Sequence, residues 1–219
     1  MVQKSDRKRG RPRAYDPDTA LSRAMAAFWD GGYAATSLDD LRLATGMNRP
    51  SLYGAFGDKR AIYRKAFASY REFGQAALRE ALAYDRPLRQ SLHRVYDKAL
   101  SIYLAGDSGA RGCFLIATGL PEAVSDVELR AALSDALAEF DEAFEARFRF
   151  AQAQGELTAT IDPAGLAKLA SAVLHFLAVR SRAGQPRAAL EPAVEAWLDL
   201  IGGLQKIANG GARPYPGLE

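Results

Sequence analysis

Several side chains between residues 36 and 59 have the chemistry to contact DNA: Thr36, Arg49, Pro50, Ser51, Tyr53 and Lys59. A guanidinium such as that of Arg49 can donate two parallel hydrogen bonds to a guanine edge, and Pro50 can touch a thymine methyl group. The hydroxyl groups and the lysine can hold the chain in register through phosphate oxygens. We therefore examined which elements would have to present these side chains.

The apolar residues of the same stretch recur at the spacing of two short helices: Leu38, Leu41 and Ala44, then Met47, Leu52 and Phe56. Gly46 stands between them and supplies the backbone freedom of a tight turn. Helix N-caps are expected at Thr36 or Ser37, with Asp39 or Asp40 three residues on, and at Asn48. This pattern predicts a helix-turn-helix, because a generic helical pair rarely combines the turn glycine with an asparagine cap.

Helical periodicity continues along the rest of the chain, and no strand-like alternation is found. Before the helix-turn-helix we expect a helix from an Asp18 cap to about Gly31, and after it a long helix from an Asp58 cap to about Ala83. Further helices are expected from Pro87 to about 105, over 111–120, from a Ser125–Glu128 capping box to about 155, from Asp162-Pro163, and over 190–209. The sequence thus predicts an all-α fold.

Basic residues are concentrated at the N-terminal end of the chain. Residues 1–65 hold 13 Lys and Arg against 7 Asp and Glu, whereas residues 66–219 hold 16 against 19. The segment around Arg9-Gly10-Arg11-Pro12 is similar to an arm that lies in an A·T-rich minor groove, so Arg9 and Arg11 are candidate DNA contacts. A solvated tail without DNA contact is the alternative.

Cys113 is the single cysteine, which excludes an internal disulfide and fits a reducing, cytoplasmic location. It follows Arg111-Gly112 at the expected start of a helix, where the helix dipole and the arginine would favour the thiolate. A lone cysteine in an apolar run is more often a small buried hydrophobic residue, and both interpretations stay open.

Enzyme chemistry is not indicated. No nucleophile with a placed base, paired-carboxylate pattern or cofactor motif occurs, and the two histidines are too few for a metal site. No cofactor is expected. The longest apolar runs are short, and the basic N-terminus lacks the apolar stretch of a signal peptide, so we expect no membrane contact.

Residues 15–67 resemble the N-terminal domain of the TetR family of transcriptional regulators. The resemblance rests on these residues: Ala26, Phe28, Gly32, Tyr33, Thr36, Ser37, Leu38, Leu41, Ala44, Gly46, Met47, Ser51, Leu52, Tyr53, Phe56, Lys59, Ile62 and Phe67. Pro50 and Gly54-Ala55 depart from the commonest pattern of the family. The remainder matches in helical layout and in an Arg-Gly-Cys-Phe segment.

The resemblance implies a small-molecule pocket between the helices of the C-terminal domain. Residues 92–180 supply its candidate lining: Tyr96, Tyr103, Cys113, Phe114, Phe140, Phe144, His175 and Phe176. Aromatic residues at helical spacing are more often plain core, which is the competing interpretation. Some relatives with a similar Gly-Cys pair sense oxidants or electrophiles, so Cys113 is a candidate sensor.

The last two expected helices carry heptad-like apolar stripes, listed here as candidate dimer contacts: Leu166, Leu169, Val173, Val194, Trp197, Ile201 and Leu204. Such a hairpin can dock on its two-fold mate, and a four-helix bundle of this kind is how the resembled family dimerises. A role in the protomer core alone is the alternative.

We therefore expect a basic arm (1–14), a three-helix DNA-binding domain with a helix-turn-helix (15–65), a larger helical ligand-binding and dimerisation domain (66–209) and a tail (210–219). The expected function is that of a homodimeric repressor that binds a palindromic operator in double-stranded DNA and is relieved by a small-molecule or electrophile effector. An architectural DNA-binding protein without an effector is the alternative.

Overall fold

The computed structural model describes residues 16–106 and 109–209, with side chains through residue 203. Within these ranges the chain is helical and has no strand, which confirms the all-α prediction. The elements are α1 (Pro17–Ala35), α2 (Leu38–Thr45), α3 (Arg49–Phe56), α4 (Lys59–Ala81), α5 (Leu88–Tyr103), η1 (Leu115–Gly119), α6 (Leu120–Glu122), α7 (Val127–Ala153), α8 (Pro163–Arg182) and α9 (Arg187–Asn209).

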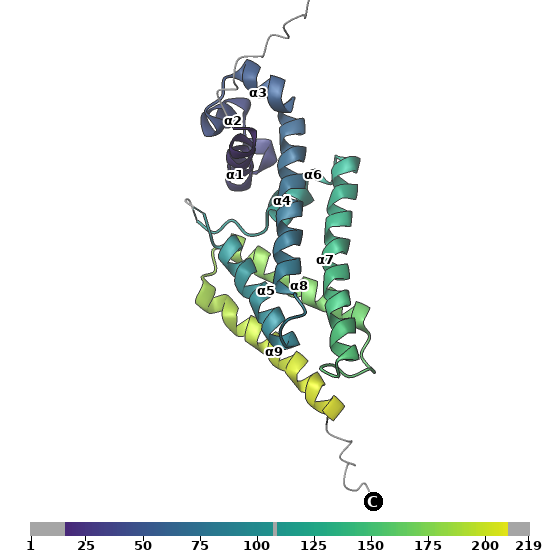
Figure 1. The fold of residues 1–219 in the computed structure, drawn as a ribbon. Coiled ribbons are helices and arrows are strands. Elements are labelled where there is room, and N and C mark those ends of the chain that lie inside the picture. Colours follow the sequence, from purple (N-terminus) through teal and green to yellow (C-terminus); the bar gives the residue numbers. More distant parts are fainter. Residues whose placement is uncertain (1–15, 107–108, 210–219) are drawn as a thin grey trace, which may run out of the picture.

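Figure 1 shows α1, α2 and α3 gathered at one end of the molecule, which we call the reading head. α4 runs from the reading head into a second group of helices formed by α5, α7, α8 and α9. In this group α8 packs on α7 and α5, and α5 also packs on α4 and α9. One helix therefore belongs to both parts of the molecule.

Local capping explains where the helices of the reading head begin. Ser37 and Asp40 form a reciprocal capping box at the start of α2, and Gly46 ends that helix in the left-handed conformation. The Asn48 side chain accepts the Ser51 N–H at 2.9 Å at the start of α3. These predicted caps are confirmed, as is Asp58 at the start of α4.

Two predicted caps were wrong. Asp16, not Asp18, caps α1, because Pro17 takes the first helical position and the Asp16 carboxylate accepts the Thr19 N–H at 3.1 Å. At the start of α7 the cap is Asp126, whose carboxylate accepts the Leu129 N–H at 3.1 Å. The predicted Ser125–Glu128 capping box is therefore absent.

The predicted helix over residues 111–120 is also different in the structure. Regular helix is replaced by the π-helical turn η1, followed by the short α6. Gly112 has φ of 67°, and a Cβ there would lie 2.5 Å from the Ala178 carbonyl oxygen of α8. The chain thus passes so close to α8 that residue 112 must lack a side chain, and helix can begin only after it.

Candidate functional site

The reading head presents α3 on its surface. Leu52 and Phe56 of α3 are buried with Met47 and Leu41, so the opposite face of the helix is free. On that face Arg49, Pro50 and Tyr53 are exposed, and Ser51 is half-buried. The structure thus brings these four predicted residues together on one exposed helix.

Arg49 does not extend freely into solvent. Its Nη2 atom lies 2.8 Å from Oδ2 of Asp39 at the start of α2, and both side chains are 56% exposed. The hydrogen bond from Arg49 is the largest cause that lowers the pKa of the Asp39 carboxyl, so this acid is ionised at neutral pH. The candidate base-reading arginine is therefore held by a fixed negative charge.

Thr36 is not placed for the predicted phosphate contact. The residue is 4% exposed, and its hydroxyl donates to the Gly32 carbonyl oxygen at 2.7 Å. The same carbonyl, of a glycine with φ of 77° inside α1, also accepts the Thr36 backbone N–H at 3.3 Å. Thr36 stabilises the end of α1, and we remove it from the candidate DNA contacts.

Lys59 lies at the start of α4, beside the reading head. Its Nζ atom is 4.4 Å from the centre of the Tyr33 ring and donates to the Ala34 carbonyl oxygen at 3.4 Å. The neighbouring Arg60 pairs with Asp126 at 2.7 Å. The start of α4 therefore keeps Lys59 as its candidate phosphate ligand.

Arg9 and Arg11 lie outside the residues that the structure describes.

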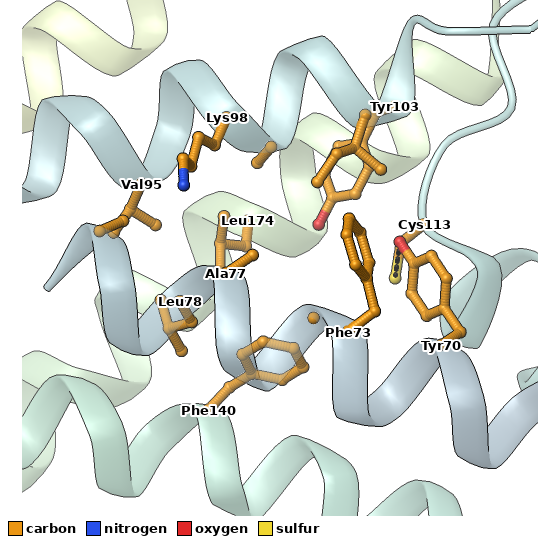
Figure 2. Close-up of a pocket in the computed structure, with 14 residues that line it drawn as sticks. Tyr70, Phe73, Ala77, Leu78, Val95, Lys98, Tyr103, Cys113, Phe140 and Leu174 are labelled. Atoms are coloured by element: carbon orange, nitrogen blue, oxygen red, sulfur yellow. Dashed lines mark hydrogen bonds between the residues drawn. The ribbon is translucent and has the colours of Figure 1, made fainter.

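A narrow cavity of about 50 Å³ lies along the inner side of α4. Figure 2 shows side chains from α4, α5, α7 and α8 directed toward it, together with Cys113 from the segment before η1. We call it the inner cavity, and its lining is Tyr70, Phe73, Gly74, Ala77, Leu78, Ala81, Val95, Lys98, Ala99, Ile102, Tyr103, Cys113, Phe140 and Leu174. The walls are mostly apolar, with a few polar groups that could orient a ligand.

The hydroxyl and thiol groups of the inner cavity lie at one end, away from Lys98 (Figure 2). The Tyr70 hydroxyl donates to the Cys113 sulfur at 3.8 Å, and Tyr103 lines the same end of the cavity. Burial raises the pKa of the Cys113 thiol. Hydrogen bonds to the sulfur lower this pKa, but by less than burial raises it. The expectation of a favoured thiolate is thus contradicted, because Arg111 pairs with Asp30 at 2.7 Å instead.

Of the predicted ligand-binding residues, Tyr103, Cys113 and Phe140 line the inner cavity. The other predicted residues are placed elsewhere: Tyr96, Phe114 and Phe144 are buried, and His175 is half-buried outside the cavity lining. The Tyr96 hydroxyl donates to the Ala170 carbonyl oxygen at 3.1 Å, and Phe114 packs against Trp29. These side chains form core, as the competing interpretation held. Phe176 is exposed on α8, where the Arg180 guanidinium covers its ring.

Several cavity residues stand at positions that no sequence pattern marks as a site: Tyr70, Phe73, Gly74, Lys98 and Leu174. On α4 the only signal was a glycine in the interior of a long helix, which weakens a helix by about 1 kcal/mol and so marks a position of special packing. A Cβ at residue 74 would lie 3.3 Å from the Phe140 ring. Gly74 thus allows α4 to approach α7 beside the cavity.

Charged side chains connect α4 to the N-terminus of α7. Asp126 accepts hydrogen bonds from Arg60 and from Arg64, each at 3.0 Å, while it caps α7. Arg64 also pairs with Glu128. Nearby, the Tyr63 hydroxyl of α4 donates to the Thr118 hydroxyl of η1 at 2.9 Å. Hydrogen bonds and ion pairs therefore connect the first turns of α4 to α7 and to η1, which follows Cys113 in the chain.

The predicted dimer residues divide into two groups. Leu166, Val194 and Ile201 are buried inside the protomer, because α8 and α9 use those sides to pack on the core. Leu169 is 56% exposed, whereas Val173 and Trp197 are half-buried, and the side chain of Leu204 lies outside the described part. Burial in the protomer removes the first three from the candidate interface.

An apolar stripe remains exposed on α8, formed by Leu169, Phe176 and Val179, and α9 exposes Leu200. α8 is also the one helix among the described residues that is long and apolar enough to cross a membrane. A core helix of a globular protein meets the same criteria, and α8 packs on α5, α7 and η1. The exposed stripe is therefore a candidate contact surface.

Fold and site together define a class of protein: a helix-turn-helix DNA-binding regulator with a helical second domain. Residues 20–66 match the family model described as bacterial regulatory proteins, tetR family, and residues 87–197 match the tetracyclin repressor-like C-terminal domain. The chain belongs to the TetR family of transcriptional regulators. It is a DNA-binding transcription factor and not an enzyme.

Similar proteins support the same assignment. The chain is 29% identical over 178 residues to the transcriptional repressor ComR of Escherichia coli (strain K12), covering 80% of this chain and 84% of ComR. It is 32% identical over 116 residues to the repressor BdcR of the same organism, covering 53% of this chain and 58% of BdcR. A cysteine mutant of the TetR-family regulator CifR, solved with 26-base-pair operator DNA, is 35% identical, with a TM-score of 0.77 over 87% of this chain and 98% of that chain.

Proposed function

We propose that the protein is a homodimeric repressor that releases a palindromic operator when a small molecule or an electrophile occupies the inner cavity. The observation that carries this proposal is the course of α4, which begins beside the reading head at Lys59 and lines the inner cavity as far as Ala81 (Figure 1). A change in the cavity that moves α4 would therefore move the reading head as well.

The size of the inner cavity supports a mechanical response. A volume of about 50 Å³ corresponds to on the order of one or two water molecules. A larger effector would displace lining side chains such as Phe140, which lies between α7 and Gly74 of α4. The Asp126 pairs with Arg60 and Arg64 would transmit that displacement to the start of α4.

Polar groups at the end of the inner cavity indicate how an effector is held. The Tyr70 and Tyr103 hydroxyls can donate hydrogen bonds, and burial raises the pKa of both phenols, so they stay protonated at neutral pH. Cys113 is likewise a protonated thiol. An electrophile would thus react by being bound next to the sulfur rather than by meeting an exposed thiolate.

Two reading heads are needed for a palindrome, and the exposed apolar stripe on α8 supports a two-fold dimer. We propose that Leu169, Phe176 and Val179, with Leu200 of α9, contact the second subunit. Each reading head would then enter a major groove with Arg49 on a base edge and Pro50 against a thymine methyl group. Phosphates would be contacted by Ser51, Tyr53 and Lys59, and the minor groove by Arg9 and Arg11. A cytoplasmic location follows from this role.

Capture of genomic DNA tests the proposed function. The purified protein is incubated with sheared DNA from its source genome at about 0.15 M salt, and the retained fragments are sequenced. Enrichment of one or a few palindromic sites is expected. A broad A·T-rich background without a palindrome would instead support the architectural alternative and contradict a specific repressor.

A further inference from the structure

Asp39 does not cap α2, although as an acid in the first turn it interacts favourably with the helix dipole. The capping of α2 is carried out by Ser37 and Asp40, whose carboxylate accepts the Ser37 N–H at 2.8 Å. Asp39 instead projects to the surface, where it contacts Arg49 of α3 at 2.8 Å and Arg42 at 3.5 Å. Its most direct partner is therefore the candidate base-reading residue, across the turn of the helix-turn-helix.

Stability does not explain the position of this acid. Ion pairs between exposed side chains contribute little to folding, because solvent screens them and both side chains lose conformational freedom. An exposed carboxylate beside a reading helix also repels DNA phosphates, within a Debye length of about 10 Å at 0.1 M salt. A surface selected only for affinity would not carry it. Its value has to lie in what it does to Arg49.

We propose that Asp39 is a specificity-determining residue that positions Arg49 for a base edge and disfavours its contact with phosphate. This inference rests on the proposed reading role of Arg49. A guanidinium has five N–H donors, so Arg49 can donate two hydrogen bonds to a guanine edge and keep another to Asp39. To reach a phosphate it would have to leave Asp39, whose carboxylate would then face the polyanion with only the more distant Arg42 as a partner.

The test compares Asp39→Asn with the wild type on three duplexes of equal length. These are the operator obtained by genomic capture, the same operator with the base pair read by Arg49 changed in each half-site, and an unrelated sequence. Affinities are measured by fluorescence anisotropy at several salt concentrations. Asp18→Asn is the matched control, because it removes the same charge from the start of α1 without touching Arg49.

Asp39→Asn is expected to strengthen binding to the unrelated duplex and to lower the ratio of operator to changed-operator affinity by about tenfold, the size of one bidentate contact to a base. Asp18→Asn is expected to leave that ratio unchanged. If both variants strengthen binding to all three duplexes equally, only net charge matters and the inference is overturned.

Arg49→Ala separates this inference from the proposed function. If Arg49→Ala lowers the affinity ratio while Asp39→Asn leaves it unchanged, Arg49 reads the base without help from Asp39, and the inference alone fails. If Arg49→Ala itself leaves the ratio unchanged, the reading role of Arg49 fails, and the Asp39 inference with it. In the Arg49→Ala background, Asp39→Asn should not change the ratio further, and a persistent change would contradict action through Arg49.

Discussion

Arg49 and Lys59 are held by different kinds of partner, and this difference separates their expected roles. Arg49 donates to a carboxylate, which fixes the plane of its guanidinium at the start of the exposed helix α3. Lys59 rests on the Tyr33 ring, from where its charge remains available to a phosphate. The planar guanidinium of Arg49 can donate two parallel hydrogen bonds to a base edge, whereas the ammonium of Lys59 suits a phosphate of the DNA backbone.

Replacing Arg49 with Ala should therefore relax discrimination at one position of each half-site, at a cost of about 1–3 kcal/mol for the preferred base. Lys59→Ala should weaken binding to all sequences alike and reduce the salt slope by about one. Anisotropy titrations on operator variants at several salt concentrations measure both effects. Uniform loss across sequences for both variants would contradict the assignment of Arg49.

The Cys113 thiol provides a prediction of pH dependence. Burial raises its pKa, so the native fold favours the protonated form, and less thiolate is present at neutral pH than for a free thiol with pKa about 8.5. Alkylation by N-ethylmaleimide should therefore be slow at pH 7.5 and still increase with pH above the point where a free thiol levels off. The raised pKa also affects the free energy of unfolding. The protonated thiol stabilises the native fold fully below the thiol pKa of the unfolded chain, and this contribution is lost as pH rises through the raised pKa of the native fold.

Protein unfolded in guanidinium chloride supplies the control for the alkylation rates, because the same sulfur is then exposed. Native protein that reacts at neutral pH as fast as the unfolded chain would show that Cys113 is an accessible thiolate. That result would contradict both the burial of the sulfur and its protonation.

At the level of the helices, Asp126 is one of the contacts that connect the start of α4 to the second domain. It caps α7 and accepts hydrogen bonds from two arginines of α4. Asp126→Ala should lower the free energy of unfolding by about 1 kcal/mol or more, because a capping side chain is lost along with the partner of both arginines. Operator affinity should also fall, since the orientation of the reading head is less restricted.

Glu128→Ala is the matched control, because Glu128 lies two residues further along, is largely exposed and pairs with Arg64 alone. It should change the free energy of unfolding by no more than about 0.5 kcal/mol. Thermal unfolding followed by circular dichroism and anisotropy on the operator measure the two variants. Equal effects of both substitutions would contradict a special role of Asp126.

Elements set by local interactions could be predicted from sequence, and contacts between distant helices could not. The caps Ser37, Asn48 and Asp58 each bond a backbone group three residues away, so sequence spacing reveals them. The Asp126 cap is equally local and was missed because Ser125 and Glu128 offered a competing capping box one residue earlier, whereas its contacts with Arg60 and Arg64 join residues more than 60 positions apart. The π-helical turn was missed because it depends on the close passage of Gly112 over α8.

The same distinction applies to the candidate site. The exposed residues of α3 follow from the spacing of its buried ones, so the sequence predicted them as a group. The inner cavity is formed where α4, α5, α7 and α8 meet, and its residues have the same spacing as ordinary core residues. Only their position in the assembled fold separates Tyr103 and Phe140, which line the cavity, from Tyr96 and Phe144, which are core.

At the scale of the whole molecule, the exposed stripe on α8 predicts the oligomeric state. Leu169→Glu combined with Val179→Glu should dissociate the proposed dimer, because two charges would be buried without partners at the interface. Sedimentation velocity should show a dimer for the wild type and a monomer for this variant. Val124→Glu introduces a charge at an exposed valine away from α8 and should leave the dimer intact. A variant that remains dimeric would place the interface elsewhere.

The central claim is that occupation of the inner cavity controls DNA binding, and it is tested most directly by filling the cavity covalently. Because Cys113 is the only cysteine among the 219 residues, N-ethylmaleimide modifies the protein at this single sulfur. Operator affinity is measured by anisotropy before and after complete modification, with helix content checked by circular dichroism and with Cys113→Ser as the unreactive control. We expect a large loss of operator affinity with helix content retained. Unchanged operator affinity of the fully modified protein would contradict it.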